Sequence, residues 1–118
     1  MKTTRILLLA VIAALAAPSA SDAAPRTVSC QAPSGMFAMH ARNGASCSTA
    51  RTVSHRWSAT RCCSMTGVVR AGGSDWSCRV RILSTTPSPG DDTVHGRIAC
   101  HRAGSKQSVD WQYEGAGA

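Results

Sequence analysis

The chain has 118 residues, with six cysteines, four histidines and five aromatic side chains, and it carries thirteen Lys and Arg against six Asp and Glu. This length allows one small domain, which excludes a multi-domain enzyme, and the lack of any repeat of 20–50 residues excludes a solenoid array. The cysteines and the formal net charge of +7 are therefore the main clues to its class.

The first 23 residues have the pattern of a secretory signal peptide. A lysine and an arginine precede the apolar run 6–17, and small residues follow it. Twelve apolar residues are too few for a membrane-spanning helix, which needs about 20. The pattern predicts cleavage near Ala23 and secretion to the extracellular space or the periplasm. A lipoprotein signal ending at Cys30 is the weaker alternative, because Cys30 lies thirteen residues beyond the apolar run.

Removal of residues 1–23 leaves 95 residues with a net charge of +6 and keeps every cysteine. An even number of cysteines in an exported chain predicts three disulfides, although six cysteines allow 15 connectivities. The cysteines expected to pair are Cys30, Cys47, Cys62, Cys63, Cys78 and Cys100. Zinc sites prefer paired ligands at short spacing, and the chain has no C-x-x-C, so neither a metal nor another cofactor is expected.

The first half of the mature chain predicts a lead-in, a strand and a helix. Residues 24–34 contain two prolines and little apolar content, which indicates an extended lead-in. Residues 36–42 have the composition of a strand, and Asn43-Gly44 ends it. Ser46 can cap a helix over about 47–58. The apolar stripe of this helix consists of Cys47, Ala50, Val53 and Trp57.

The second half of the mature chain predicts an antiparallel meander. Apolar and polar residues alternate over 76–83, 94–101 and 109–114, and residues 86–92 form a loop. A two-residue type II′ turn at Gly104-Ser105 would pair Cys100 with Val109 and Ile98 with Trp111, which puts apolar residues on one face. Residues 65–70 can add a strand before Gly72-Gly73.

The same alternation places Cys78 beside Cys100 in the first hairpin of the meander. These two cysteines can therefore bond to each other, or both can reach the helix and the loop before it. Cys62 and Cys63 are adjacent, and neighbouring side chains in extended backbone point to opposite faces. They are expected to bond to different partners.

These elements predict an α+β fold in which one short helix, about 47–58, is joined by disulfides to a three- to five-stranded antiparallel sheet. The single domain covers 35–114, and 115–118 form a flexible tail.

Four short motifs lie within about residues 40–113. They are Gly44-Ala45-Ser46-Cys47-x-x-Ala50-Arg51-x-Val53-x-x-x-Trp57, Trp76-x-Cys78, Ile98-x-Cys100 and Val109-x-Trp111. In these motifs the chain resembles small secreted cysteine-containing domains common in high-GC bacteria, and Cys62-Cys63 departs from the usual pattern of those domains. The resemblance implies export and an α+β fold. That family has no agreed activity, so it implies no functional residue.

The outward face of the meander is the candidate surface for an anion or a protein partner. It collects Arg79, Arg81, Arg97, His95 and His101. Arg81 opposes Arg97 in the predicted register, and an anion that accepts bidentate hydrogen bonds would relieve their repulsion. The alternative interpretation is an ordinary solvated strand face.

No catalytic site can be assembled from the sequence. The four histidines are the only candidates for acid–base catalysis, and His95 and His101 lie about 20 Å apart along one strand. His55 could meet His40, but no spacing requires it. The chain has no G-x-S-x-G, H-E-x-x-H or phosphate-loop motif.

The sequence therefore predicts a small secreted basic binding protein without catalytic activity. Its expected partner is an anionic surface or polymer, or an extracellular protein. Nucleic acid is disfavoured, because the tryptophans and Tyr113 belong to the expected core and cannot stack on bases. The alternatives are a protease inhibitor that presents the loop 84–93, and a cationic toxin or ribonuclease-like protein that uses His40 and His55.

Overall fold

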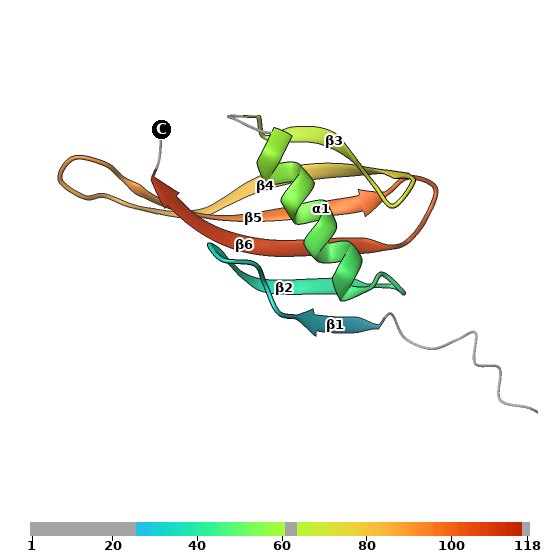
Figure 1. Ribbon diagram of the computed structural model, residues 1–118. Coiled ribbons are helices and arrows are strands. Elements are labelled where there is room, and N and C mark those ends of the chain that lie inside the picture. The colour runs from blue at the N-terminus through green and yellow to red at the C-terminus, as the bar shows by residue number, and fades with distance from the viewer. Residues whose placement is uncertain (1–25, 61–63, 117–118) are drawn as a thin grey trace, which may run out of the picture.

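The residues that the structure describes form one antiparallel sheet with a helix across one of its faces (Figure 1). The computed structural model describes residues 26–60 and 64–116. Its elements are β1 (Thr27–Cys30), β2 (Met36–Arg42), α1 (Cys47–Thr60), β3 (Thr66–Ala71), β4 (Ser74–Thr86), β5 (Thr93–Arg102) and β6 (Ser108–Ala116). The six strands lie in the order β1-β2-β6-β5-β4-β3. No helix in the described ranges is long and apolar enough to cross a membrane.

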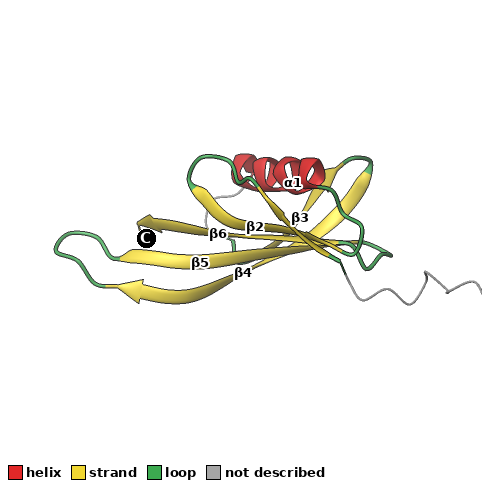
Figure 2. Cartoon of the chain, turned by 90° about the horizontal axis from the view of Figure 1, so that it is seen from below, coloured by secondary structure: helices red, strands yellow, loops and turns green. Residues whose placement is uncertain are grey.

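The helix connects the two halves of the sheet. It leaves β2 near one edge, crosses the sheet diagonally and returns the chain at β3, which is the opposite edge (Figure 1). Strands β3 to β6 then form a meander that brings β6 back against β2. Seen from the side, α1 covers one face only, and the β4–β5 hairpin projects beyond it (Figure 2).

The start of α1 follows from its capping residue. The Thr49 amide donates a hydrogen bond of 3.0 Å to Oγ of Ser46, which satisfies one of the free N–H groups of the first turn. The predicted apolar stripe is confirmed, because Ala50 and Val53 are fully buried and Trp57 nearly so. The helix ends at Thr60, two residues later than predicted.

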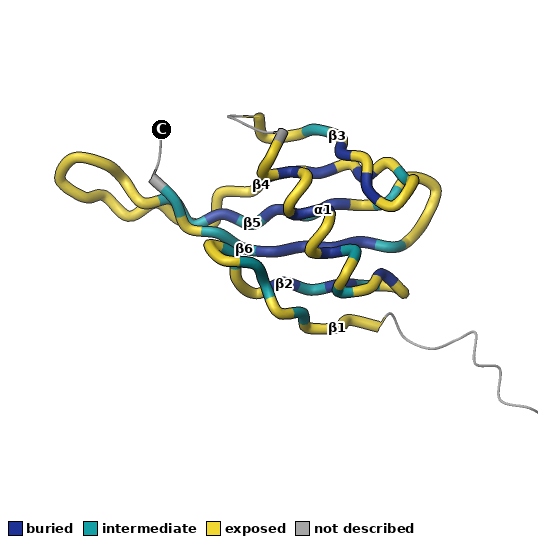
Figure 3. The backbone as a smooth tube through the Cα atoms, in the orientation of Figure 1, coloured by how far each residue is buried: buried dark blue, intermediate teal, exposed yellow. Residues whose placement is uncertain are grey.

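The core lies between α1 and the sheet, where the buried positions gather (Figure 3). Trp76 and Trp111 are each 1% exposed and are the largest of the fully buried side chains. The core side chains of each strand alternate with side chains on the other face of the sheet. We call that uncovered side the open face. Its side chains include Phe37, His40, Arg42, Thr66, Val68, Ser77, Arg79, Arg81, His95, Arg97, Ala99, His101, Ser108, Asp110, Gln112 and Glu114.

The predicted register of the meander is confirmed. Cys100 lies opposite both Cys78 and Val109, and Ile98 lies opposite Trp111. The predicted type II′ turn is wrong, since the Ser105 amide donates to the carbonyl of Arg102 and the turn begins one residue earlier. The predicted register is nevertheless correct. Arg102 is hydrogen-bonded to Gln107, so the connection between them has four residues instead of two and keeps the same strand pairing.

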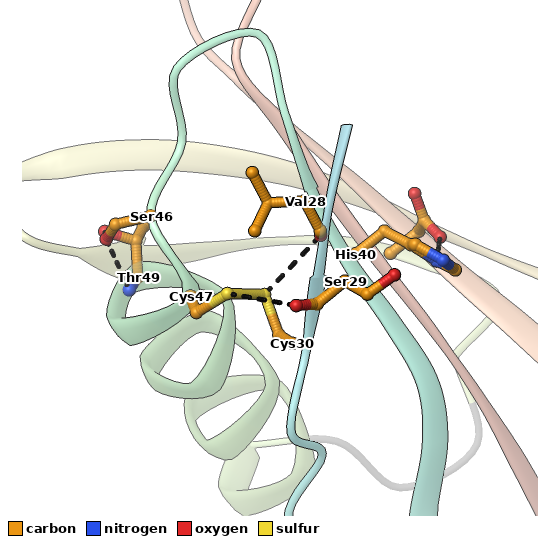
Figure 4. Close-up of a disulfide and its surroundings, with 8 residues drawn as sticks. Val28, Ser29, Cys30, His40, Ser46, Cys47 and Thr49 are labelled. Carbon is orange, nitrogen blue, oxygen red and sulfur yellow. Dashed lines mark hydrogen bonds and ion pairs between the residues drawn. A yellow bond between two sulfur atoms is a disulfide. The ribbon is translucent and has the colours of Figure 1, made fainter. Parts of the chain in front are cut away.

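Two disulfides join elements of the described chain. Cys30–Cys47 ties β1 to the first turn of α1 (Figure 4), and Cys78–Cys100 crosses from β4 to β5 beneath the helix. Of the two arrangements open for Cys78 and Cys100, the structure has the direct bond. Cys62 and Cys63 lie outside the described residues, so their expected pairing is untested, although the four described cysteines are paired with one another.

The sheet is larger than the three to five strands predicted. Residues 24–34, expected to be a lead-in, contain β1, which pairs with β2 from Thr27↔Arg42 to Cys30↔Met39. The prolines of this segment flank the strand instead of interrupting it. β6 also continues to Ala116, within the predicted tail, because Gly115 and Ala116 pair with the start of β5.

A bulge in β2 contains a strained residue. Ala38 has φ of +49° where the β2–β6 register shifts, and its side chain is exposed. The left-handed conformation costs a non-glycine residue about 1–2 kcal/mol. We expect Ala38→Gly to stabilise the protein by up to about 1 kcal/mol, since glycine's greater entropy loss offsets part of the relief.

Urea unfolding monitored by circular dichroism tests this expectation. Gly104→Ala is the matched control, because Gly104 has φ of +69° with open space around it. Gly104→Ala should lower the free energy of unfolding by about 1 kcal/mol, because alanine is strained in this left-handed conformation. Destabilisation by both substitutions would contradict the strain at Ala38.

Candidate anion-binding surface

All five residues predicted for the anion or partner surface lie on the open face. Arg79, Arg81, Arg97, His95 and His101 have the orientation that the alternation predicts. They do not form one cluster, because the structure gives two of them partners within the protein and leaves the others facing solvent.

Arg97 is one of two guanidinium groups that lie beside a buried carboxylate. Asp110 lies on β6 with its side chain only 6% exposed. The Nε–H of Arg42 donates to Oδ2 of Asp110 at 2.7 Å, and Nη2 of Arg97 lies 3.4 Å from the same oxygen. Nδ1 of His40 lies 3.4 Å from Oδ1 but lacks the alignment of a hydrogen bond. We call these four residues the Asp110 cluster.

The surroundings of Asp110 keep it ionised. Burial alone raises the pKa of Asp110, but the hydrogen bond from Arg42 and the charges of Arg42, Arg97 and His40 outweigh it. The net pKa lies below the usual value for aspartate. The same hydrogen bond raises the pKa of Arg42. The Asp110 cluster is therefore a structural ion-pair network that joins β2, β6 and β5.

His95 is held by neutral partners. Its Nε2 lies 2.7 Å from Oε1 of Gln112 on the adjacent strand, and its ring centroid lies 5.4 Å from that of Phe37. The side chain is therefore oriented by the sheet and is not available as a flexible ligand.

Arg79 and Arg81 have a different environment. Both are exposed and lie two residues apart on the same face of β4, about 7 Å apart along the strand. Arg81 also lies directly opposite Arg97. Among the described residues, no carboxylate forms an ion pair with Arg79 or Arg81. Like charges at neighbouring positions of a sheet destabilise it, so this part of the open face favours an anion.

A shallow depression lies beside Arg79. It has a volume of about 510 Å³ and is lined by residues of β3, β4 and β5. The side chains that line it from the open face are Thr66, Val68, Ser77, Arg79, Ala99 and His101. We call it the β3–β5 depression. The described residues that line it supply one guanidinium, one imidazole and two hydroxyl groups, and no carboxylate.

The structure does not support a pair of catalytic histidines. His40 lies on the open face, whereas His55 is an exposed residue of α1, which covers the opposite face. The proposed meeting of these two imidazoles is therefore wrong. The β3–β5 depression contains a single imidazole, that of His101. In the described part of the chain, no group of three or more potential ligands is placed to bind a metal ion.

The segment predicted as an inhibitory loop is partly regular strand. Ser84, Thr85 and Thr86 pair with β5, so the connection itself is 87–92. It lies at the end of the projecting hairpin (Figure 2), several residue pairs away from Cys78–Cys100. Protease inhibition stays an alternative prediction, although this disulfide does not hold the tip of the hairpin directly.

Sequence reasoning missed the Asp110 cluster. The alternation over 109–114 places Asp110 on the outward face of the meander, but the pairing of β2 with β6 was not predicted. That pairing places His40 opposite Asp110 and Arg42 opposite Ser108. The available signal was the alternation of His40 and Arg42 with Met39 and Ala41 in the segment that forms β2.

Comparison with known proteins does not extend this description. No protein-family model matches the chain, and neither a curated protein nor a solved structure shows significant similarity to it.

Proposed function

We propose that the protein is a small secreted binding module whose open face binds an anionic polymer of the extracellular environment. The observation that carries this proposal is the pair Arg79 and Arg81, which lie side by side without a carboxylate partner among the described residues. Bidentate hydrogen bonds from arginine to phosphate or sulfate oxygens would offset their mutual repulsion.

Two features support an extracellular setting. The apolar N-terminal run has the length and flanks of a signal peptide. Cys30–Cys47 and Cys78–Cys100 are disulfides, which persist mainly in oxidising compartments. These features favour a partner such as a cell-wall or matrix polymer.

The composition of the open face favours a polymer without bases. Trp76 and Trp111 are buried, and Tyr113 packs against the core. Among the described residues of the open face, Phe37 is the one aromatic residue other than histidine. Single-stranded nucleic acid is usually held on several stacking rings. A phosphate- or sulfate-bearing polymer needs only the arginines.

Titration with polyphosphate in a calorimeter tests the proposal. We expect saturable binding that weakens as salt rises, because binding releases counterions. Arg79→Gln combined with Arg81→Gln should weaken it at least about tenfold, since two charged contacts are lost. The control combines Arg51→Gln on α1 with Lys106→Gln in the β5–β6 turn, which removes the same charge from positions outside the strands of the sheet.

The control pair should change the affinity by about twofold or less. Equal losses of affinity in the two double variants would show that polyphosphate binding depends only on net charge. The open face would then not be the binding surface. Tighter binding of a single-stranded RNA with the same number of phosphates would point to base recognition and would overturn the choice of polymer.

A further inference from the structure

We infer that the β3–β5 depression is a binding pocket for one tetrahedral oxyanion, namely a phosphate or sulfate group. This inference rests on the proposed function and deepens it, because it assigns one anionic group of the polymer to a defined place on the open face.

The register of three strands builds the pocket. One row across the sheet runs Thr66, Arg79 and Ala99, and the next runs Val68, Ser77 and His101. Ala99 is small, and between the longer side chains of Arg79 and His101 it leaves space above the sheet. The depression therefore results from a small residue surrounded by larger ones, on β4 and β5, which are paired on both sides, and on the edge strand β3.

The donors of the pocket converge. Arg79 and His101 are diagonal neighbours on adjacent strands, which places their Cβ atoms about 7–8 Å apart. Both side chains can therefore reach one anion between them. The guanidinium offers two parallel N–H donors, and the hydroxyl groups of Thr66 and Ser77 add neutral donors at the rim.

The charges around the pocket favour a single anion. No carboxylate of residues 26–60 and 64–116 lines it. Asp110, on the strand next to Ala99, is already paired with Arg42 and Arg97. Arg79 therefore has no competing internal partner among the described residues. By contrast Arg97, which the sequence suggested as an equal member of the surface, is committed to Asp110.

The size of the pocket agrees with an anionic group carried on a larger molecule. A volume of about 510 Å³ exceeds that of a phosphate or sulfate ion alone. The apolar side chains of Val68 and Ala99 can contact the carbon skeleton next to that group. Val68 is 64% exposed, so this contact would cover an apolar side chain that the fold leaves open to solvent.

The test uses the folded full chain with intact disulfides and two probes, inorganic phosphate and inorganic sulfate. Nuclear magnetic resonance should show saturable shifts in the signals of Arg79, Ser77 and His101. Arg79→Gln should weaken phosphate binding at least about tenfold, and Ala99→Leu should do the same by filling the pocket without changing the charge.

Two control variants separate the pocket from the wider surface. Arg81 lies on the open face outside the pocket. Arg81→Gln should change the affinity for phosphate by about twofold or less, while it lowers the affinity for polyphosphate. Arg51→Gln on α1 should affect neither. Each variant is first checked for an unchanged unfolding midpoint, and His101→Gln gives a second approach if Ala99→Leu disturbs the sheet.

The outcomes distinguish the two proposals. Polyphosphate binding without saturable shifts at Arg79 and His101 would overturn the pocket and leave the proposed function intact. Phosphate binding in the pocket without polyphosphate binding would support the pocket and overturn the polymer. A preference for phosphate over sulfate, or the reverse, identifies the anionic group. Resonance shifts centred on Arg81 and Arg97 would place the bound anion outside the pocket and contradict the inference.

Discussion

Removal of the Cys78–Cys100 disulfide by Cys78→Ala and Cys100→Ala is expected to cost about 3 kcal/mol of folding stability. The two cysteines are 22 residues apart in sequence, and the entropy of closing a loop of this length in the unfolded chain accounts for roughly that value. Both side chains are buried beneath α1, at 3% and 0% exposure, so the smaller alanines also reduce packing in the core.

Urea unfolding without reductant measures this loss. The matched control replaces Cys30 and Cys47, which are 17 residues apart, join the edge strand β1 to the first turn of α1 and are both half-buried. Its loop is of similar length, so the control should lose nearly as much entropy but less packing. A smaller loss for the Cys78 and Cys100 pair than for the control would contradict the importance of the buried bond.

The second large effect is expected at Asp110. Asp110→Asn should destabilise the protein by about 2 kcal/mol at neutral pH, because it removes the charge that accepts the hydrogen bond from Arg42. Arg42 and Arg97 would then lie near each other without a shared anion. Asp75→Asn is the control, since Asp75 pairs with Arg70 on the surface and should lose less than about 1 kcal/mol.

The same variant predicts a change in the dependence of stability on pH. The pKa of Asp110 is lower in the folded protein than its unfolded value of 3.8, so the folded state favours the ionised form. Its contribution is therefore fully present well above pH 3.8 and is lost as the pH falls through the lower, folded pKa. The free energies of unfolding of the parent and of Asp110→Asn should converge in strong acid. A constant difference between them down to pH 2 would contradict the ion-pair role.

The helix and the meander were predictable because their signals are local. Ser46 lies one residue before the first turn, and Ala50, Val53 and Trp57 repeat at the spacing of a helix. Alternation in β4, β5 and β6 predicted which side chains face the core. It also predicted the opposition of Arg81 to Arg97 and of Cys78 to Cys100.

The edge of the sheet was not predictable in the same way. β1 has only four residues, and its burial pattern is almost entirely exposed. Such a strand has no alternation to detect, and it forms because β2 offers free backbone groups and Cys30 is bonded to Cys47. The bulge at Ala38 likewise depends on how β2 aligns with β6, two segments far apart in the chain.

The surface charges likewise include features that single segments predict and features that depend on strand pairing. The amino-acid order is enough to predict that the chain is basic, contains six cysteines, and places Arg79, Arg81, Arg97, His95 and His101 on one face. Composition and period-2 alternation are properties of single segments, and they need no knowledge of the neighbouring strand. Which of these charges are already paired depends on the packing of the strands against one another. Pairing of β2 with β6 brings Arg42 and His40 to Asp110, which engages Arg97, whereas the row through Ala99 leaves Arg79 beside an open depression. The availability of an arginine depends on residues that lie within a few ångströms in space and tens of positions away in the chain.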